Sequence, residues 1–119
     1  MTHTDGSPSD EQALLRLLVS GDAAATDRVL GLAADTRSVA VLVAAAVVTG
    51  AVAPLRRAAG LATSTRDRQL VALAEARLTA GEDVFDALVR DHLADHPDQL
   101  LAAWMAAREH RPTHPEELR

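Results

Sequence analysis

Two histidines four positions apart are the side chains of this sequence best suited to chemistry. His92 and His96 stand in the run His92-Leu93-Ala94-Asp95-His96, and residues four positions apart lie on the same face of an α-helix. Imidazole is a common ligand of zinc, so two imidazoles on one face are within reach of a single metal ion. A metal-dependent enzyme centred on His92 and His96 is therefore one hypothesis for the function.

The same run resembles the HxxEH pattern of inverted zinc peptidases, from which it differs in one residue type. That pattern needs a glutamate base and a third metal ligand, whereas Asp95 stands at the fourth position here. The alternative is structural, because His92 lies in the helical stripe of Leu88 and Val89, where it would be packed and hydrogen-bonded. His96 would then end the helix. In this interpretation no catalytic residue, metal or other cofactor is expected.

The rest of the composition offers little for catalysis. The sequence contains no cysteine, which excludes disulfides, thiol nucleophiles and cysteine-based zinc sites. No phosphate-binding loop, dinucleotide-binding fingerprint or nucleophile elbow is present. The net charge of −5 argues against nucleic-acid binding. We expect the helix-end arginines to be solvated and paired with Asp67; they are Arg56, Arg57, Arg66 and Arg68. The first ten residues show no secretion signal, so a cytoplasmic location is expected.

The elements that position these side chains are arranged around one uncharged run, residues 38–55. Its large apolar side chains fall on several helical faces, which predicts a helix over residues 38–49 that is covered on nearly all sides. A membrane span is the alternative, but a run of 18 residues is at the lower limit for spanning, and Gly50 and Pro54 interrupt it. We therefore expect a buried central helix and no membrane span.

Helical periodicity, capping residues and turn glycines divide the rest of the chain into six further helices. With 119 residues, 48% of them hydrophobic, the chain is long enough for one core. Ser9 and Gln12 form a capping box, and Gly21 and Gly50 are typical of helix ends. No stretch alternates with the period of a strand. The expected helices cover residues 9–20, 22–34, 38–49, 54–62, 66–80, 82–95 and 98–110, in a single domain at 9–110 between a disordered lead at 1–8 and a flexible tail at 111–119.

Capping and packing residues follow from the same patterns. Asp22 and Ser64 are expected to cap the helices that follow them, and Thr36 or Asp35 to cap the central helix. Aromatic residues make up only 2% of the chain, so the core is expected to consist mainly of alanine, leucine and valine. In the sixth helix the periodicity places four side chains inward, namely Val84, Phe85, Leu88 and Val89.

An internal repeat is present in the first half of the chain. Residues 21–37 align with residues 50–66 without a gap, and eight of the 17 positions are identical. Gly31 and Gly60 match inside the second helix of each unit, where glycine costs about 1 kcal/mol relative to alanine. Their recurrence indicates close approach of a neighbouring helix, with a chance match in an alanine-rich chain as the alternative. Repeated hairpins predict a solenoid in which each hairpin buries its apolar face on the next.

Residues 66–107 resemble the tetratricopeptide repeat. The resemblance consists of a helix, a turn at Gly81, a second helix, and Pro97 before the next helix. The packing positions of the first helix hold Leu70, Leu73 and Ala74. Arg77 replaces the usual aromatic residue, and the first two units are 29 residues long, which is shorter than the family's repeat. The resemblance implies an all-α fold, a short right-handed solenoid of helical hairpins with about seven helices.

The resemblance also implies a protein-binding scaffold, whose ligand would lie on the face formed by the first helix of each hairpin. On the helix at 66–80 this face would carry Arg68, Val71, Glu75 and Leu78. On the central helix it would carry Val39, Leu42, Ala46 and Thr49. A covered core at the same positions is the alternative.

The last helix predicts a second contact surface. No helix is expected to follow it and cover its outer side, where the small side chains are Ala102, Ala103, Ala106 and Ala107. Uncovered apolar surface commonly marks an interface, and a two-fold dimer is the commonest closed arrangement. Ala103 and Ala107 are therefore candidate contact residues. The expected function is a non-enzymatic interaction module that binds a protein partner or a second copy of itself.

Overall fold

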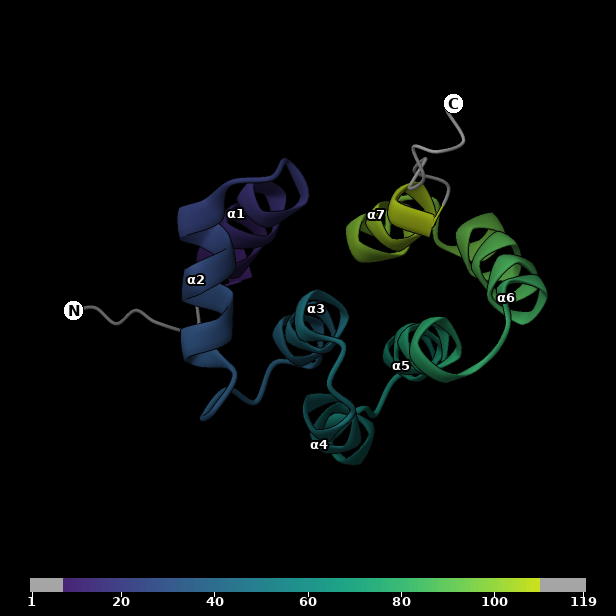
Figure 1. The fold of residues 1–119 in the computed structure, drawn as a ribbon, viewed down its shortest axis with the longest axis horizontal. Helices are drawn as coiled ribbons and strands as arrows, with labels where there is room; N and C mark the ends of the chain where they lie inside the picture. The colour runs from purple at the N-terminus through teal and green to yellow at the C-terminus, as the bar shows by residue number, and fades with distance from the viewer. Residues whose placement is uncertain (1–7, 110–119) are drawn as a thin grey trace, which may run out of the picture.

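The computed structural model describes residues 8–109, which form seven α-helices and no β-strand (Figure 1). The helices are α1 (Pro8–Val19), α2 (Ala23–Leu32), α3 (Val39–Thr49), α4 (Ala53–Leu61), α5 (Thr65–Thr79), α6 (Glu82–Asp95) and α7 (Leu100–Glu109). The predicted all-α class is confirmed. The predicted lead, apart from Pro8, and the predicted tail at 111–119 lie outside the described residues. Among residues 8–109, no helix is both long enough and apolar enough to cross a membrane.

Helix α3 begins at a serine cap and ends at a left-handed glycine. The Ser38 Oγ accepts a hydrogen bond from the Val41 N–H over 3.2 Å, which satisfies one of the donors that every helix start leaves unpaired. Gly50 ends the helix at φ 75°, a conformation that favours glycine. The predicted caps Thr36 and Asp35 are wrong, because the helix starts further along the chain. The Thr36 Oγ1 instead accepts from the Ser38 N–H over 3.1 Å.

The other predicted caps depend on equally local signals. The Asp22 Oδ1 accepts from the Ala24 N–H at the start of α2, and the Ser64 Oγ accepts from the Asp67 N–H at the start of α5, each over 3.0 Å. Both were predicted from the sequence. The prediction for α1 is wrong by one residue, since the helix begins at Pro8 and Ser9 lies inside its first turn. Proline is well suited to that position because it lacks the N–H that would be left unpaired there.

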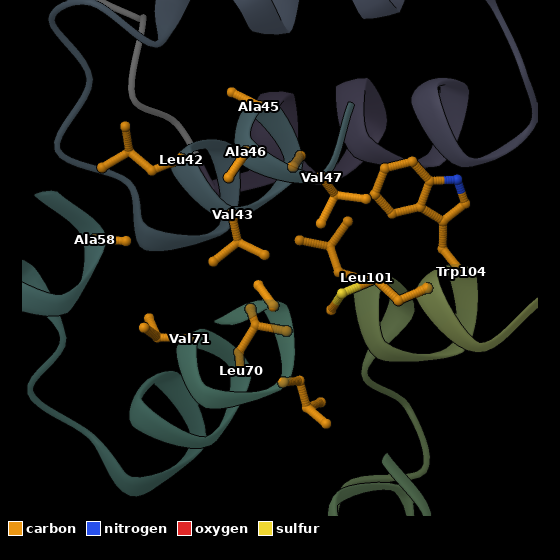
Figure 2. Packing of buried hydrophobic residues seen from close by; sticks show 14 of the residues in the cluster. Leu42, Val43, Ala45, Ala46, Val47, Ala58, Leu70, Val71, Leu101 and Trp104 are labelled. Carbon is orange, nitrogen blue, oxygen red and sulfur yellow. The ribbon is translucent and has the colours of Figure 1, made fainter. Parts of the chain in front are cut away.

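The core surrounds α3, as the uncharged run predicted. Eight of the eleven residues of α3 are buried, because the helix contacts α2, α4, α5 and α7. Figure 2 shows Val43 pointing toward α5, and the indole of Trp104 directed from α7 toward the end of α3 that holds Val47. Side chains of alanine, valine and leucine fill most of the remaining core, so neighbouring helices can pack closely.

The chain curves, so that its first and last helices meet. From α3 onward, each helix contacts the next, and α3 also contacts α5, which in turn contacts α7. That sequence of contacts is typical of stacked hairpins. However, α1 contacts α7, and Figure 1 shows the chain passing from α1 and α2 around α3 and α4 to α6 and back to α7. In an open stack of this length the two ends would not touch, so α7 is less exposed than the sequence predicted.

Two of the four side chains predicted to face inward from α6 do not. Phe85 and Val89 are buried, but Val84 is 50% exposed and Leu88 is 37% exposed. Helix α6 contacts α5 and α7, which cover one edge of its apolar stripe. Within residues 8–109 no further helix covers the other edge, so the prediction is wrong for Val84 and Leu88.

The repeated glycines also differ from the prediction. Gly31 and Gly60 both lie on exposed positions of α2 and α4, and no heavy atom outside the adjoining backbone lies within 4 Å of the place a Cβ would take. The predicted close approach of a neighbouring helix is therefore wrong at both positions. Their recurrence has no packing explanation in this fold.

Candidate functional site

A cavity of about 400 Å³ lies where α1, α2, α3 and α7 come together. It is bounded by the end of α1 and the turn after it, by the first part of α2, by the end of α3 and by α7. Its lining residues are Leu18, Val19, Ser20, Gly21, Thr26, Val48, Trp104 and Ala107. Pockets that hold small ligands measure about 300 to 1,000 Å³, so this cavity is large enough to hold a group of that size.

The cavity follows from residue sizes and from the path of the backbone. Gly21, at φ 95°, turns the chain between α1 and α2 without a side chain, and Ala107 presents only a methyl group one helical turn after Trp104. Trp104 is the single tryptophan of the sequence and is almost entirely buried. A large aromatic residue beside two small ones therefore forms one wall and leaves the adjoining space open.

The hydroxyl groups in the cavity wall are already engaged by the backbone. The Ser20 Oγ donates to the carbonyl of Leu17 over 2.8 Å, and the Thr26 Oγ1 donates to the carbonyl of Asp22 over 3.2 Å. Neither hydroxyl hydrogen is then available to a ligand. The other lining side chains are mainly apolar, so the cavity offers more contact surface to an apolar group than to a polar one.

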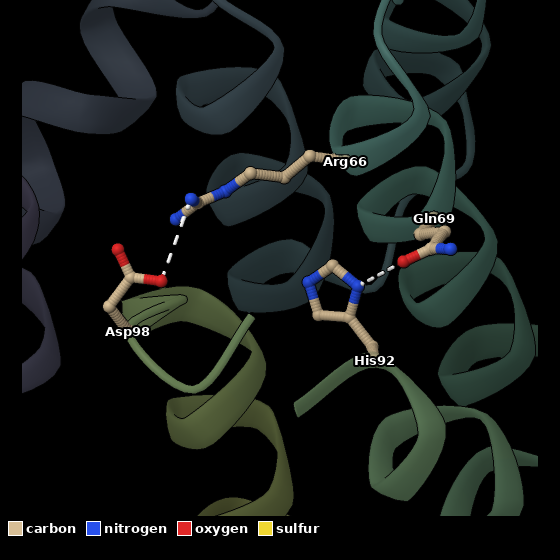
Figure 3. Close-up of polar contacts among 4 residues, drawn as sticks. All are labelled: Arg66, Gln69, His92 and Asp98. Atoms are coloured by element: carbon tan, nitrogen blue, oxygen red, sulfur yellow. Dashed lines mark hydrogen bonds and ion pairs between the residues drawn. The ribbon is translucent and has the colours of Figure 1, made fainter. Parts of the chain in front are cut away.

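His92 lies in a different part of the fold, at the packing of α6 on α5. It is 2% exposed, and its Nδ1 lies 2.8 Å from the Oε1 of Gln69 on α5 (Figure 3). Because a carbonyl oxygen only accepts, Nδ1 carries the proton and donates it. The other ring nitrogen, Nε2, is buried without a hydrogen-bond partner in the described part of the chain. The packed, hydrogen-bonded role of the sequence alternative is the one that this geometry fits.

The two histidines do not form a metal site of the predicted kind. The ring centroids of His92 and His96 lie 4.9 Å apart with the planes tilted by 40°. Among residues 8–109, no three histidine or carboxylate side chains are grouped so that they could hold a metal ion. We therefore assign no metal to this pair. Burial is the main cause that lowers the pKa of His92. The nearby His96 and Arg66 lower this pKa further, whereas Asp95 raises it.

Comparisons with known proteins identified no relative. No family model matches this chain, and neither the curated proteins nor the solved structures include a match. The tetratricopeptide resemblance accordingly stays a prediction that rests on the sequence pattern.

The predicted ligand face on α5 is only partly accessible. Arg68 and Glu75 are exposed and Leu78 is half-buried, whereas Val71 is 8% exposed and belongs to the core. The corresponding positions of α3 are also buried, except for Thr49; they are Val39, Leu42 and Ala46. A partner could reach Arg68 and Glu75, but it could not reach Val71 in the folded chain. The apolar part of that face is covered core.

The predicted contact residues on α7 are accessible in the folded chain. Ala103 and Ala107 are exposed, whereas Ala102 is buried and Ala106 is half-buried. Ala107 is the only predicted contact residue that lines the cavity. The sequence patterns missed the contribution of α1 and α2, because residues so far from α7 in the sequence give no local sign of meeting it. The one available signal was Trp104, the single tryptophan of the sequence.

The arginines form different pairs from those predicted. Arg66, at the start of α5, lies 3.6 Å from the carboxylate of Asp98 in the turn before α7 (Figure 3). Its predicted pairing with Asp67 is therefore wrong. Asp98 is largely exposed, so this ion pair contributes little stability by itself. It nevertheless places a positive charge beside the junction that contains His92.

Proposed function

We propose that this protein is a non-enzymatic interaction module, which binds an apolar segment of a partner protein in the cavity between α1, α3 and α7. The observation that supports this proposal is the cavity wall, which combines Trp104 with Leu18, Val48 and other apolar side chains. An apolar side chain of a partner would gain about 25 cal/mol for each Å² of surface removed from water there. Tryptophan is also among the residues that contribute most to binding energy at protein interfaces.

The position of the cavity agrees with the predicted repeat. According to the resemblance, the ligand would be held by the first helix of each unit, namely α1, α3, α5 and α7, and three of these helices line the cavity. Those three helices provide five of the residues that line the cavity: Leu18, Val19, Val48, Trp104 and Ala107. The cavity therefore lies on helices of the kind that the resemblance implies, although Ala107 is the only predicted contact residue in its lining.

The metal-dependent alternative has less support. A metal ion would have to reach the Nε2 of His92, because Nδ1 is hydrogen-bonded to Gln69, but the Nε2 is buried. Two imidazoles alone also provide fewer ligands than the three protein ligands that a catalytic zinc site uses. Zinc measured in protein purified without a tag or chelator, and its loss in His92→Ala, would revive this alternative.

Capture experiments with matched variants test the proposal. Ala107→Phe should fill the cavity, whereas Ala59→Phe adds the same side chain at an exposed position of α4 that does not line the cavity. We expect the unmodified protein and Ala59→Phe to capture the same partner from the native host, and Ala107→Phe to lose it. If Ala107→Phe retains the partner, the cavity is not its binding site.

A purified partner then allows a direct measurement. Because both variants leave Trp104 as the only tryptophan, its fluorescence reports on the cavity without labelling. Binding should change the emission of the unmodified protein and of Ala59→Phe. The affinity of Ala107→Phe should be lower by at least about tenfold, which corresponds to about 1.4 kcal/mol.

A further inference from the structure

The junction of α5, α6 and α7 contains a buried imidazole that is suited only to its neutral form. His92 links α6 to α5 through its hydrogen bond to Gln69. Its Nε2 is buried and has no acceptor within the described residues. A second link, the ion pair of Arg66 with Asp98, joins the start of α5 to the turn before α7 (Figure 3). Both links hold the same corner of the fold.

The charged groups around His92 mostly oppose a second proton on its ring. His96, which follows α6, and Arg66, at the start of α5, both disfavour the imidazolium, whereas Asp95, the last residue of α6, favours it. Asp98, in the turn before α7, is already paired with Arg66. Residues 100–107 of α7 have no titratable side chain. A proton on Nε2 would therefore place a charge in a buried position without a hydrogen-bond acceptor, which is strongly unfavourable.

We infer that His92 is an acid-sensitive latch, which holds α6 against α5 while its imidazole is neutral and releases α6 when it is protonated. Helix α7 supplies Trp104 and Ala107 to the cavity. Helix α7 packs on α6, so if the proposed function is correct, release of α6 would loosen α7 and lower the affinity of the cavity for a partner in mildly acidic surroundings. The latch itself does not depend on that function.

The direction of the pH effect follows from the pKa of His92, which burial lowers from its ordinary value of 6.5. Between the lowered pKa and 6.5, the unfolded chain binds this proton and the folded chain does not. The contribution of His92 to the free energy of unfolding is therefore fully present above pH 6.5. It decreases as the pH falls through this interval, and it does not change further below the pKa of the folded state. A single group of this kind raises the unfolding equilibrium constant by at most about tenfold per pH unit.

Urea unfolding of the full chain, followed by Trp104 fluorescence between pH 8 and pH 5, tests the latch. The variants are His92→Phe, which removes the titrating group from the buried position, and His96→Gln, which removes the half-buried neighbour. The carboxylates of the chain contribute equally to the pH dependence of unfolding in all three proteins. Below pH 6.5, we expect the unfolding equilibrium constants of the unmodified protein and of His96→Gln to rise more steeply with falling pH than that of His92→Phe. The difference should be up to about tenfold per pH unit.

Two results would overturn the inference. One is a His92→Phe protein with the same dependence on pH as the unmodified protein. The other comes from an NMR titration of the histidine rings in the unmodified protein, which also decides the question if His92→Phe does not fold. A His92 ring that titrates below pH 6.5, with the proton on Nδ1, supports the latch, and a ring that titrates at or above 6.5 contradicts it. Neither experiment uses a partner, so failure of the latch and failure of the proposed function are distinguishable.

Discussion

The guanidinium of Arg57 donates through Nη2 to the main-chain carbonyl of Thr36 over 2.8 Å, and so joins α4 to the loop between α2 and α3. Its Nη1 donates to the carbonyl of Ala33, the residue that follows α2. Carbonyls at a helix end have no partner within the helix, and here one planar side chain satisfies two acceptors in the same loop. The link fixes the approach of α2 to the central helix.

Removal of the Arg57 side chain should weaken the fold. Arg57→Ala loses two charge-assisted hydrogen bonds at an exposed site, and we expect the free energy of unfolding to fall by about 1 kcal/mol. Arg57→Lys should recover only part of this loss, because an ammonium lacks the planar fork that reaches both carbonyls. Arg56→Ala, at the neighbouring exposed position, is the matched control and should change stability by less than about 0.5 kcal/mol. Urea titrations measure all three, and equal stability of Arg57→Ala and Arg56→Ala would contradict the assigned role.

Substitution by alanine should have opposite effects at Gly60, inside a helix, and at Gly50, at a helix end. Gly60 lies inside helix α4, and the position that a Cβ would take there is open. Gly60→Ala should therefore stabilise the protein by up to about 1 kcal/mol. Gly50 lies at φ 75°, where a side chain is strained, so Gly50→Ala should destabilise it by about 1 kcal/mol or more. Thermal melts compare both variants with the unmodified protein. A loss of stability in Gly60→Ala would instead support the close contact with a neighbouring helix that the sequence predicted.

Local sequence signals predicted local structure well. The caps at Asp22 and Ser64 and the glycine end at Gly50 depend on residues within a few positions of one another, so the sequence alone identifies them. The burial of α3 was also predictable, because valines on all faces of one helix exclude any exposed side. The stripe that contains Leu88 and Val89 likewise indicated that His92 is packed.

Contacts between distant segments could not be predicted in the same way. The meeting of α1 and α7 depends on small rotations that accumulate over every intervening hairpin. The hydrogen bond of His92 joins it to Gln69, 23 positions earlier, and periodicity within α6 contains no information about that partner. Periodicity also gives the centre of an apolar stripe but not the edges that neighbours cover, which explains the error at Leu88. The cavity is a volume left between four helices, so no single helix shows it.

The central helix should not tolerate a charge. Leu42 is fully buried at the middle of α3, and Leu42→Asp would place a carboxylate there without a partner, at a cost of several kcal/mol. We expect this variant not to fold, as circular dichroism and the absence of a cooperative melt would show. Ala72→Asp makes a matched change at an exposed position of α5 and should cost about 0.5 kcal/mol through helix propensity. A cooperatively melting Leu42→Asp protein would contradict the arrangement around α3.

Self-association through α7 is a separate prediction. Ala103 and Ala107 are exposed and one helical turn apart, so small side chains would let a helix of a second copy approach closely. We expect light scattering at micromolar concentration to show a dimer. Ala103→Glu combined with Ala107→Glu should convert it to a monomer without unfolding it, because both changes are at exposed positions. The same double change on other helices, Ala59→Glu with Ala72→Glu, is the control and should leave the dimer intact.

Variants at Ala103 and Ala107 also distinguish self-association from partner binding. Ala107 lines the cavity and Ala103 does not, so Ala103→Glu alone places a charge on the outer side of α7 while the cavity keeps its apolar wall. This single variant should weaken a dimer and still bind a partner that occupies the cavity. Ala107→Phe should have the stronger effect on that partner. If the unmodified protein is monomeric at every concentration tested, the homodimer is excluded, and the exposed strip of α7 is then available only to a different protein.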